Sequence, residues 1–305
     1  MKVLFVHEYS DNVAGQEVSL LDRLEGLGAR GIQCEVLLPG EGEFADRLRQ
    51  AGVPVRKAQL YRVESRLRPL PYMRTVAAIA GHLAAGRFDL VHCSGIYPHQ
   101  YCLPAARALG RPTVVHINTS AYTRYCYNSN MLRRANLTIT VSDKVRTTVL
   151  EHADVRPWRV VTLYDGIQQE RLDEPFDRDA LRAELKIPKG HKVVGQLASL
   201  IPRKGFDTFV EAAGIVAARY PKATFLIMGR GDDPNFEGAL HRRVEKLGLG
   251  SRTRFVGFKP NYARYIDLLD ISVLASRAEG LPRILVESQM LGKPVVGTAV
   301  DGIME

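Results

Sequence analysis

Two glutamates bracket a Gly-Leu-Pro turn in "SRAEGLPRILVESQMLGKPVV", residues 276–296: Glu279 precedes the turn and Glu287 follows it. Proline is tolerated at the first helical position, where its missing N–H is not needed, so Pro282 predicts a helix that runs to about Leu291. Glu287 should then lie about a turn and a half inside this helix. A helix N-terminus suits a phosphate or a hydroxyl-rich ligand. Alternatively, Glu279 only favours the helix dipole and Glu287 faces solvent.

Two adjacent cations, Arg203 and Lys204, stand in "ASLIPRKGFDTFVEAA" between an apolar strand and a helix expected to begin near Phe206. An arginine fork and a lysine point charge beside a helix N-terminus are placed for a diphosphate. Such a pair is also common on surface loops. Its position at a strand end, in the same half of the chain as the two glutamates, favours the binding interpretation.

The N-terminal half offers two weaker candidates. Gly15 precedes a helix after the first strand, where a glycine lets the backbone approach a ligand closely or simply makes a turn. His116 closes the strand "PTVVHI" and could donate a hydrogen bond to a substrate, shuttle a proton, or be structural. The other histidines, including His92 and His99, show no metal-ligand spacing, so we predict no metal site.

Positioning these residues requires strands that alternate with helices along the whole chain. Short apolar runs predict the strands: "KVLFV", "CEVLL", "DLVHC", "PTVVHI", "LTITVS", "RVVTLY", "KVVGQLA", "ATFLIMG", "TRFVG", "ISVLAS" and "KPVVGTA". Fully apolar strands separated by helices indicate parallel sheets covered on both faces. We predict an α/β fold with two doubly wound domains facing each other across a cleft, at 1–166 and 176–305, joined by a linker at 167–175. In such sheets ligands bind at the carboxyl ends of strands.

Composition limits the class of protein. The chain of 305 residues is 46% hydrophobic and 25% charged, which is typical of a globular protein, and no apolar run approaches the roughly 20 residues that span a bilayer. Its net charge of +9 favours an anionic partner. The four cysteines lack Cys-x-x-Cys spacing and predict neither a zinc site nor a disulfide framework. We therefore expect the protein to be located in the reducing cytoplasm.

The positive charge is concentrated in residues 55–74, which hold six cations and one acid among apolar and aromatic residues. Such a segment can lie in an anionic membrane interface. It can equally be a solvated helix face or loop. Nucleic acid is not expected as a partner, because no recognised binding motif accompanies the charge.

Taken together, these features resemble the retaining GT-B glycosyltransferases of family 4 over nearly the whole chain. The most specific part is the E-x7-E element from Glu279 to Glu287. The other matching segments follow in the family's order: "TVSDKVRTTVL", "YDGIQQERL", "LIPRKGFDTFVEAA", "FLIMGRGDD" and "RFVGF". The resemblance implies transfer of a sugar from a nucleotide diphosphate to an acceptor hydroxyl, with retention at the anomeric carbon.

The resemblance also implies roles for particular residues. Glu287 would accept hydrogen bonds from the ribose hydroxyls, Glu279 would lie by the transferred sugar, and Lys204 would bind the diphosphate. The implied nucleotide-sugar-binding residues are Gly15, Ser199, Arg203, Lys204, Leu281, Pro282, Arg283 and Glu287, and the implied catalytic residues are Glu279 and His116. We expect a UDP- or GDP-linked donor, a glycan or glycolipid acceptor in cell-envelope or exopolysaccharide synthesis, and neither a metal nor another cofactor.

Several positions depart from the family pattern. Ser199 replaces the usual arginine five residues before the lysine, so diphosphate binding would lean on Arg203. Pro282 replaces a glycine and removes one N–H donor. Further departures are Ala14, Asp165 and Asp301. The chain ends at "GIME", where family members continue with more helices, so we expect an incomplete second domain and poor catalysis. A non-catalytic nucleotide-sugar-binding module and a GT-B sugar epimerase stay open as alternatives.

Overall fold

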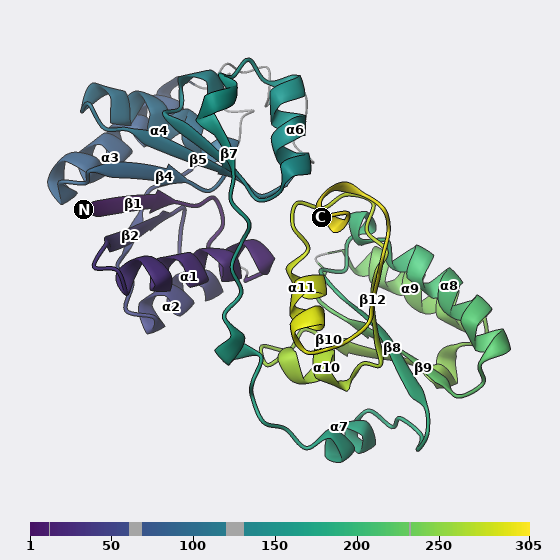
Figure 1. Ribbon diagram of the computed structural model, residues 1–305. Helices are drawn as coiled ribbons and strands as arrows, with labels where there is room; N and C mark the ends of the chain where they lie inside the picture. The colour runs from purple at the N-terminus through teal and green to yellow at the C-terminus, as the bar shows by residue number, and fades with distance from the viewer. Residues whose placement is uncertain (12, 61–68, 120–130, 232) are drawn as a thin grey trace. The chain divides into compact units, whose positions relative to one another are not determined.

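The computed structural model describes residues 1–305 except 12, 61–68, 120–130 and 232. The chain divides into two compact units (Figure 1): unit 1 is Met1–Gly166 with Glu305, and unit 2 is Ile167–Met304. Each unit contains one parallel sheet. The predicted linker, 167–175, contains a short 3-10 turn, η4 (Gln169–Arg171). The expectation that the two domains face each other across a cleft stays a prediction.

The sheet of unit 1 follows the order β3-β2-β1-β4-β5-β6-β7, with parallel neighbours throughout. Its strands are β1 (Lys2–Val6), β2 (Gln33–Leu38), β3 (Val55–Lys57), β4 (Leu90–Cys93), β5 (Thr113–Ile117), β6 (Leu137–Thr140) and β7 (Val160–Thr162). The strand order reverses at β1 and β4. In a doubly wound sheet this switch point is where loops diverge and leave room for a ligand.

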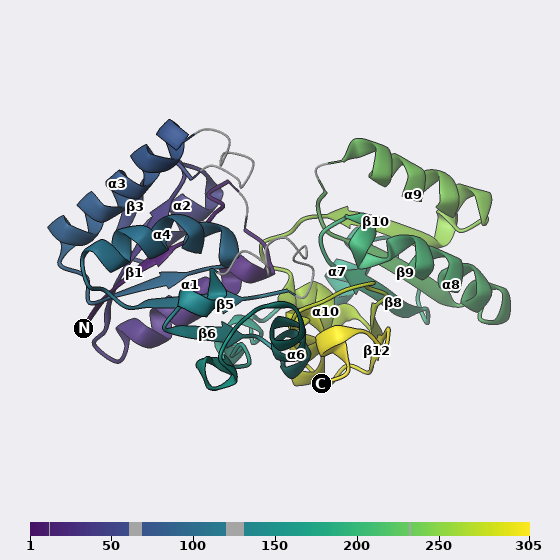
Figure 2. The ribbon, with the colours of Figure 1, turned by 90° about the horizontal axis from the view of Figure 1, so that it is seen from above.

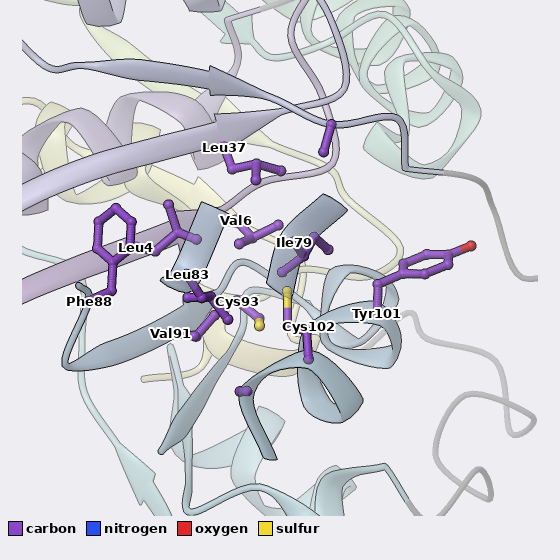
Figure 3. Close-up of a cluster of buried hydrophobic side chains, with 13 residues drawn as sticks. Leu4, Val6, Leu37, Ile79, Leu83, Phe88, Val91, Cys93, Tyr101 and Cys102 are labelled. Carbon is purple, nitrogen blue, oxygen red and sulfur yellow. The ribbon is translucent and has the colours of Figure 1, made fainter. Parts of the chain in front are cut away.

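Helices cover both faces of this sheet. In Figure 1, α1 (Gly15–Gly28) and α2 (Glu43–Gln50) lie on one face, and α3 (Pro69–Gly86) and α4 (Ile96–Ala108) on the other. Figure 3 shows the core beneath α3 and α4, where the thiols of Cys93 and Cys102 lie together. Burial raises the pKa of Cys93, and the neighbouring Cys102 thiol raises it further. The described residues of unit 1 also form η2 (Leu132–Arg134), α6 (Asp143–His152) and η3 (Pro157–Arg159).

Unit 2 has a five-stranded sheet in the order β10-β9-β8-β11-β12. Its strands are β8 (Lys192–Leu197), β9 (Ala223–Met228), β10 (Thr253–Gly257), β11 (Ile271–Leu274) and β12 (Val295–Gly297). One face packs against α8 (Phe206–Arg219) and α9 (Pro234–Lys246), which lie side by side in Figures 1 and 2. The other packs against α7 (Arg178–Glu184), α10 (Ala263–Leu268) and α11 (Arg283–Met290). Besides η4, the described residues of unit 2 form the 3-10 turns η5 (Pro202–Lys204), η6 (Gly250–Arg252) and η7 (Asp301–Ile303).

The predicted α/β class is confirmed, and each predicted apolar run contains a strand. The sequence did not predict β3, the edge strand at residues 55–57. This strand has three residues and follows Pro54, so it lacks the length and alternation by which strands are recognised. Within the described part of the chain, no helix combines the length and apolar character needed to cross a membrane.

The basic segment 55–74 begins in strand β3 and ends in helix α3. The guanidinium of Arg56 pairs with Glu35, and Lys57 pairs with Glu41, so unit 1 itself neutralises these two cations. Residues 61–68, which include three further arginines and the single acid, lie outside the described residues. The segment ends in the first turns of α3, where Leu70 and Met73 are 63% and 58% exposed beside the exposed Arg74.

Candidate functional site

The predicted cation loop lies at the carboxyl end of β8. Arg203 and Lys204 belong to η5, and α8 begins two residues later at Phe206. Gly205 connects the two elements with φ +65°, a left-handed conformation that glycine adopts without strain. A Cβ at this position would lie 1.9 Å from the carbonyl oxygen of Ala275, so the loop packs directly against the end of β11.

The carboxylate of Glu279 is the centre of a dense polar network. Lys204 Nζ and Ser276 Oγ each donate to Glu279 Oε1 at 2.5 Å, and an Arg203 guanidinium nitrogen lies 3.9 Å from Oε2. Arg203 also donates to the carbonyl of Ala278 at 2.6 Å. Glu279 is only 4% exposed, so this arrangement holds a buried anion against two cations. Burial lowers the pKa of Lys204, while the charge of Glu279 raises it; the net direction is downward.

Gln196, on β8, joins the cation loop to the glutamate loop. Its side chain is fully buried; Nε2 donates to the carbonyl of Lys204 at 2.7 Å, and Oε1 accepts the N–H of Ala275 at 3.0 Å. Gln196 was not identified from the sequence. The available signal was a single amide inside the apolar run "KVVGQLA", because a buried amide in such a strand must find hydrogen-bond partners.

The predicted helix of the E-x7-E element is α11, with Pro282 at its N-cap position. Glu287 is 3% exposed, so the alternative in which it faces solvent is wrong. Its Oε1 accepts a hydrogen bond from Tyr262 Oη at 3.0 Å and from an Arg283 guanidinium nitrogen at 3.4 Å. Tyr262 lies just before α10 and was not identified from the sequence.

Of the departures from the family pattern, Asp301 contacts this network. Asp301 adopts φ +42°, and its Oδ2 accepts the N–H of Glu279 at 2.9 Å. An aspartate can adopt this conformation because its short polar side chain bonds locally. Ser199 lies in the loop after β8, where its carbonyl accepts the N–H of Ile201. Leu281, just before α11, likewise accepts the N–H of Arg283.

In unit 1, Gly15 is the exposed first residue of α1. The start of this helix is fixed by Glu17, whose Oε2 accepts the N–H of Ala14 at 2.9 Å. The other carboxylate oxygen accepts from His7 Nε2 at 2.8 Å. Burial raises the pKa of Glu17, but His7 and backbone N–H groups outweigh it and leave the pKa lowered. Neither Glu17 nor His7 was identified as a site residue from the sequence.

His116 is 1% exposed on β5. Arg23, on α1, places a guanidinium nitrogen 2.6 Å from His116 Nδ1, and the ring of His92 is centred 5.6 Å away. Burial lowers the pKa of His116 well below its usual value, and the positive charge of Arg23 lowers it further. His116 is therefore neutral at physiological pH. This favours hydrogen-bond donation over proton shuttling among the roles considered from the sequence.

The structure thus gathers the predicted residues into groups. In unit 2, Arg203 and Lys204 meet Glu279, while Arg283 meets Glu287. Gly15 and His116 belong to unit 1. Among the described residues, no cluster of three or more His, Cys, Asp or Glu side chains is arranged to hold a metal ion. Cys126 lies outside the described residues, and the other three cysteines are unpaired thiols.

Comparisons with known proteins give the family. Residues 13–171 match the model of Glycosyltransferase Family 4, and residues 177–305 match Glycosyl transferases group 1. The chain belongs to glycosyltransferase family 4. The resemblance to this family, identified from the E-x7-E element and the order of the other segments, is therefore confirmed, and the two matches together cover nearly all of the chain.

Relatives and solved structures agree with this membership. The chain is 32% identical over 142 residues to the lipopolysaccharide core biosynthesis mannosyltransferase LpsB of Rhizobium meliloti (strain 1021), a match covering 46% of this chain but only 40% of that protein. It is 28% identical to the 2-deoxystreptamine N-acetyl-D-glucosaminyltransferase of Streptomyces fradiae over 97% of this chain and 77% of that enzyme. The structure of Anabaena Alr3699/HepE in complex with UDP and glucose has a TM-score of 0.86 and 25% identity, covering 100% of this chain and 82% of that chain. The fold is of the predicted GT-B type.

Proposed function

We propose that this protein transfers a sugar from a nucleotide diphosphate sugar to an acceptor hydroxyl, with retention of anomeric configuration and without a metal or other cofactor. The observation that carries the proposal is the network in which Lys204 and Arg203 meet Glu279 at the carboxyl ends of β8 and β11. Cations held at strand ends beside the start of a helix suit a diphosphate. Family membership supplies the reaction class.

The chain's own residues would act by stabilising the leaving group. As the bond from the sugar to the diphosphate breaks, negative charge grows on the phosphate oxygens, and Lys204 and Arg203 are already fixed near the start of α8. Glu287, buried and oriented by Tyr262, would accept hydrogen bonds from the ribose hydroxyls. Glu279 would lie by the transferred sugar. In unit 1, neutral His116 would donate a hydrogen bond to a substrate oxygen.

The similar proteins support particular chemical classes of sugar donor and acceptor. The HepE structures contain UDP or UDP-glucose, which supports a UDP-linked donor, with a GDP-linked donor as the alternative. LpsB is a mannosyltransferase of lipopolysaccharide core biosynthesis, and the Streptomyces fradiae relative is a 2-deoxystreptamine N-acetyl-D-glucosaminyltransferase. We propose a glycan or glycolipid acceptor in cell-envelope or exopolysaccharide synthesis.

Nucleotide affinity tests the site. We expect Glu287→Ala and Lys204→Ala to weaken binding of the preferred nucleotide by about 1–3 kcal/mol, because each removes one partner of a charged hydrogen bond in a dry site. Calorimetry with UDP, GDP and ADP measures this. Glu184→Ala and Lys246→Ala, exposed at the ends of α7 and α9, are the matched controls and should bind as the wild type does. Unchanged affinity in both site variants would refute the site.

Transfer assays test the chemistry. A panel of labelled nucleotide sugars, offered with and without sugar acceptors, separates a transferase from a non-catalytic binding module and from an epimerase. NMR of the product gives the anomeric configuration, and inversion would contradict the retaining mechanism. Full activity after exhaustive chelation is expected, so loss of transfer with EDTA, restored by a divalent cation, would overturn the proposed metal independence.

We also propose peripheral attachment to the cytoplasmic face of an anionic membrane through residues 55–74. Support comes from the exposed Leu70 and Met73 beside Arg74 at the start of α3. Co-sedimentation should be stronger with anionic than with neutral vesicles, should fall as salt screens the attraction, and should weaken in Leu70→Ser. Equal binding to both vesicle types, or none to either, would leave residues 55–74 as a solvated surface.

A further inference from the structure

The face of the unit 1 sheet beneath α1 changes from apolar to polar at the carboxyl ends of its strands. In the parallel register His92 pairs with Phe5 on one side and Val114 on the other, so these side chains share a face. Two residues further along β5, His116 lies on this face as well. The same face carries Val3, Phe5, Val36 and Leu38 in the core with Leu20 and Leu24 of α1. The rings of His92 and His116 are therefore buried at the polar edge of an otherwise apolar face.

Arg23 determines which nitrogen of His116 carries the proton. A guanidinium group has only donors, so the 2.6 Å contact to Nδ1 requires that Nδ1 present its lone pair. A neutral imidazole with an unprotonated Nδ1 carries its hydrogen on Nε2. The ring is kept neutral by burial and by the neighbouring positive charge of Arg23. His116 is thus the Nε2–H tautomer.

The Nε2 atom of His116 is buried and has no hydrogen-bond partner among the described residues. A buried polar atom without a partner is uncommon and marks a place where water or a ligand completes the bonding. Because the ring is neutral, its N–H suits the lone pair of a hydroxyl or ring oxygen and gives no charge-based preference for an anion.

We propose that Arg23 is a positioning residue, which locks His116 in the Nε2–H tautomer so that this N–H meets an uncharged oxygen of a bound sugar. The identity of the ligand rests on the proposed function, whereas the tautomer does not. Arg23 itself is held in place: its Nε donates to the carbonyl of Ser19 at 3.0 Å and lies 3.9 Å from Asp165 Oδ1. Asp165 thereby supplies a countercharge at a position where the chain departs from the family pattern.

The tautomer is measurable without substrate. Long-range proton–nitrogen NMR correlations of the full chain labelled with ¹⁵N-histidine distinguish the two tautomers, and His116→Gln assigns the His116 signals by their loss. In the wild type at pH 7 we expect an unprotonated Nδ1 and a protonated Nε2. Arg23→Met should shift His116 to a mixture or to the Nδ1–H form, and Arg23→Lys, which retains a charged donor, should restore the Nε2–H pattern in part.

Arg30→Met is the matched control. Arg30 follows α1 and donates to a carbonyl four residues earlier, as Arg23 does, but it is exposed and should leave the His116 signals unchanged. An Nδ1–H ring in the wild type, or an unchanged Nε2–H signature in a folded Arg23→Met, would overturn the inference. If Arg23→Met does not fold, Asp165→Asn is the second variant. It should change the His116 Nδ1 signal measurably, and an unchanged signal would contradict the inference.

The rate of sugar transfer tests whether the His116 tautomer matters for sugar binding. Arg23→Met should reduce the rate of sugar transfer at least tenfold while nucleotide affinity stays within twofold of the wild type, because the proposed nucleotide site lies in unit 2. An unchanged transfer rate in a variant with an altered tautomer would overturn the role of this N–H in sugar binding. Failure of the wild type to bind UDP or GDP would instead contradict the proposed function and leave the tautomer result standing.

Discussion

Lys204 is a half-buried cation whose charge is already partnered by Glu279. Its 2.5 Å contact with Glu279 offsets the cost of removing the ammonium group from water. A bound diphosphate would bring two or more negative charges to the same ammonium group and to Arg203. Glu279 would then exchange part of its contact with Lys204 for a hydroxyl of the sugar. Hydrogen bonds to the neighbouring backbone segments support the loops that carry this network.

Gln196 provides one part of that backbone support. We expect Gln196→Leu to destabilise unit 2 by about 2–4 kcal/mol, because it strands the carbonyl of Lys204 and the N–H of Ala275 in a buried site. Urea unfolding measures the change. Gln289→Leu, exposed at the end of α11, is the control and should stay within about 0.5 kcal/mol of the wild type. A loss below about 1 kcal/mol in Gln196→Leu would mean that water or relaxation replaces both bonds.

Asp301 also supports the backbone of the glutamate loop, through the N–H of Glu279. Its left-handed backbone costs about 1–2 kcal/mol for a residue without a local hydrogen bond, and its carboxylate caps the N–H of Glu279. We expect Asp301→Ala to be less stable than Asp301→Asn by about 1–2 kcal/mol, since asparagine keeps the acceptor and tolerates this conformation. Chemical unfolding of the two variants side by side gives the difference. Equal stabilities would show that the cap contributes nothing.

At the scale of elements, the site depends on how closely η5 and α8 approach the end of β11. Gly205 and Gly248 have nearly the same conformation, with φ +65° and +66°, but only Gly205 has a close neighbour, the carbonyl of Ala275. Gly248→Ala should cost about 1 kcal/mol from backbone strain alone. Gly205→Ala should cost at least about 3 kcal/mol, because a Cβ at 1.9 Å forces the two loops apart.

Comparing these two alanine variants separates backbone strain from steric contact. Thermal and urea unfolding give the stabilities, and UDP or GDP affinity should fall only in Gly205→Ala, since only that change displaces Lys204. Similar stability losses in the two variants would contradict the tight approach of the loops.

At the scale of the molecule, unit 1 buries histidines that stay neutral. Burial lowers the pKa of His92 to about 3 and that of His99 to about 4, and His116 shifts in the same direction. The unfolded chain takes up these protons near pH 6.5. Between that pH and the folded pKa values the unfolded state binds more protons, so stability falls as the pH falls. Linkage gives a loss of about 2 kcal/mol per histidine between pH 7 and pH 5.

Urea unfolding at pH 7 and pH 5, followed by circular dichroism, checks this expectation. In His99→Gln the loss between the two pH values should shrink by about 2 kcal/mol, because one buried titrating group is gone. His152→Gln, in the exposed last turn of α6, should leave the pH dependence unchanged. A pH dependence in His99→Gln equal to that of the wild type would show that His99 does not stay neutral in the folded protein.

The sequence alone determined the α/β class, the strands other than β3, the helix of the E-x7-E element and the cation loop. These features are local: apolar runs define parallel strands, Pro282 starts a helix, and Gly292 ends it with φ +70°. The same local signals place Arg203 and Lys204 at a strand end. The family assignment followed from the order of such segments along the chain.

The tertiary structure alone decided which side chains meet. Arg23 and His116 are 93 residues apart in the chain, and Gln196 is 79 residues from the Ala275 N–H that it accepts. Tyr262 and Glu287 are separated by 25 residues. No periodicity or spacing encodes such pairs, because they arise only when strands distant in sequence become neighbours in a sheet and bring their loops together. For the same reason the neutral state of His116 could not be inferred from its sequence context, since burial and Arg23 produce it.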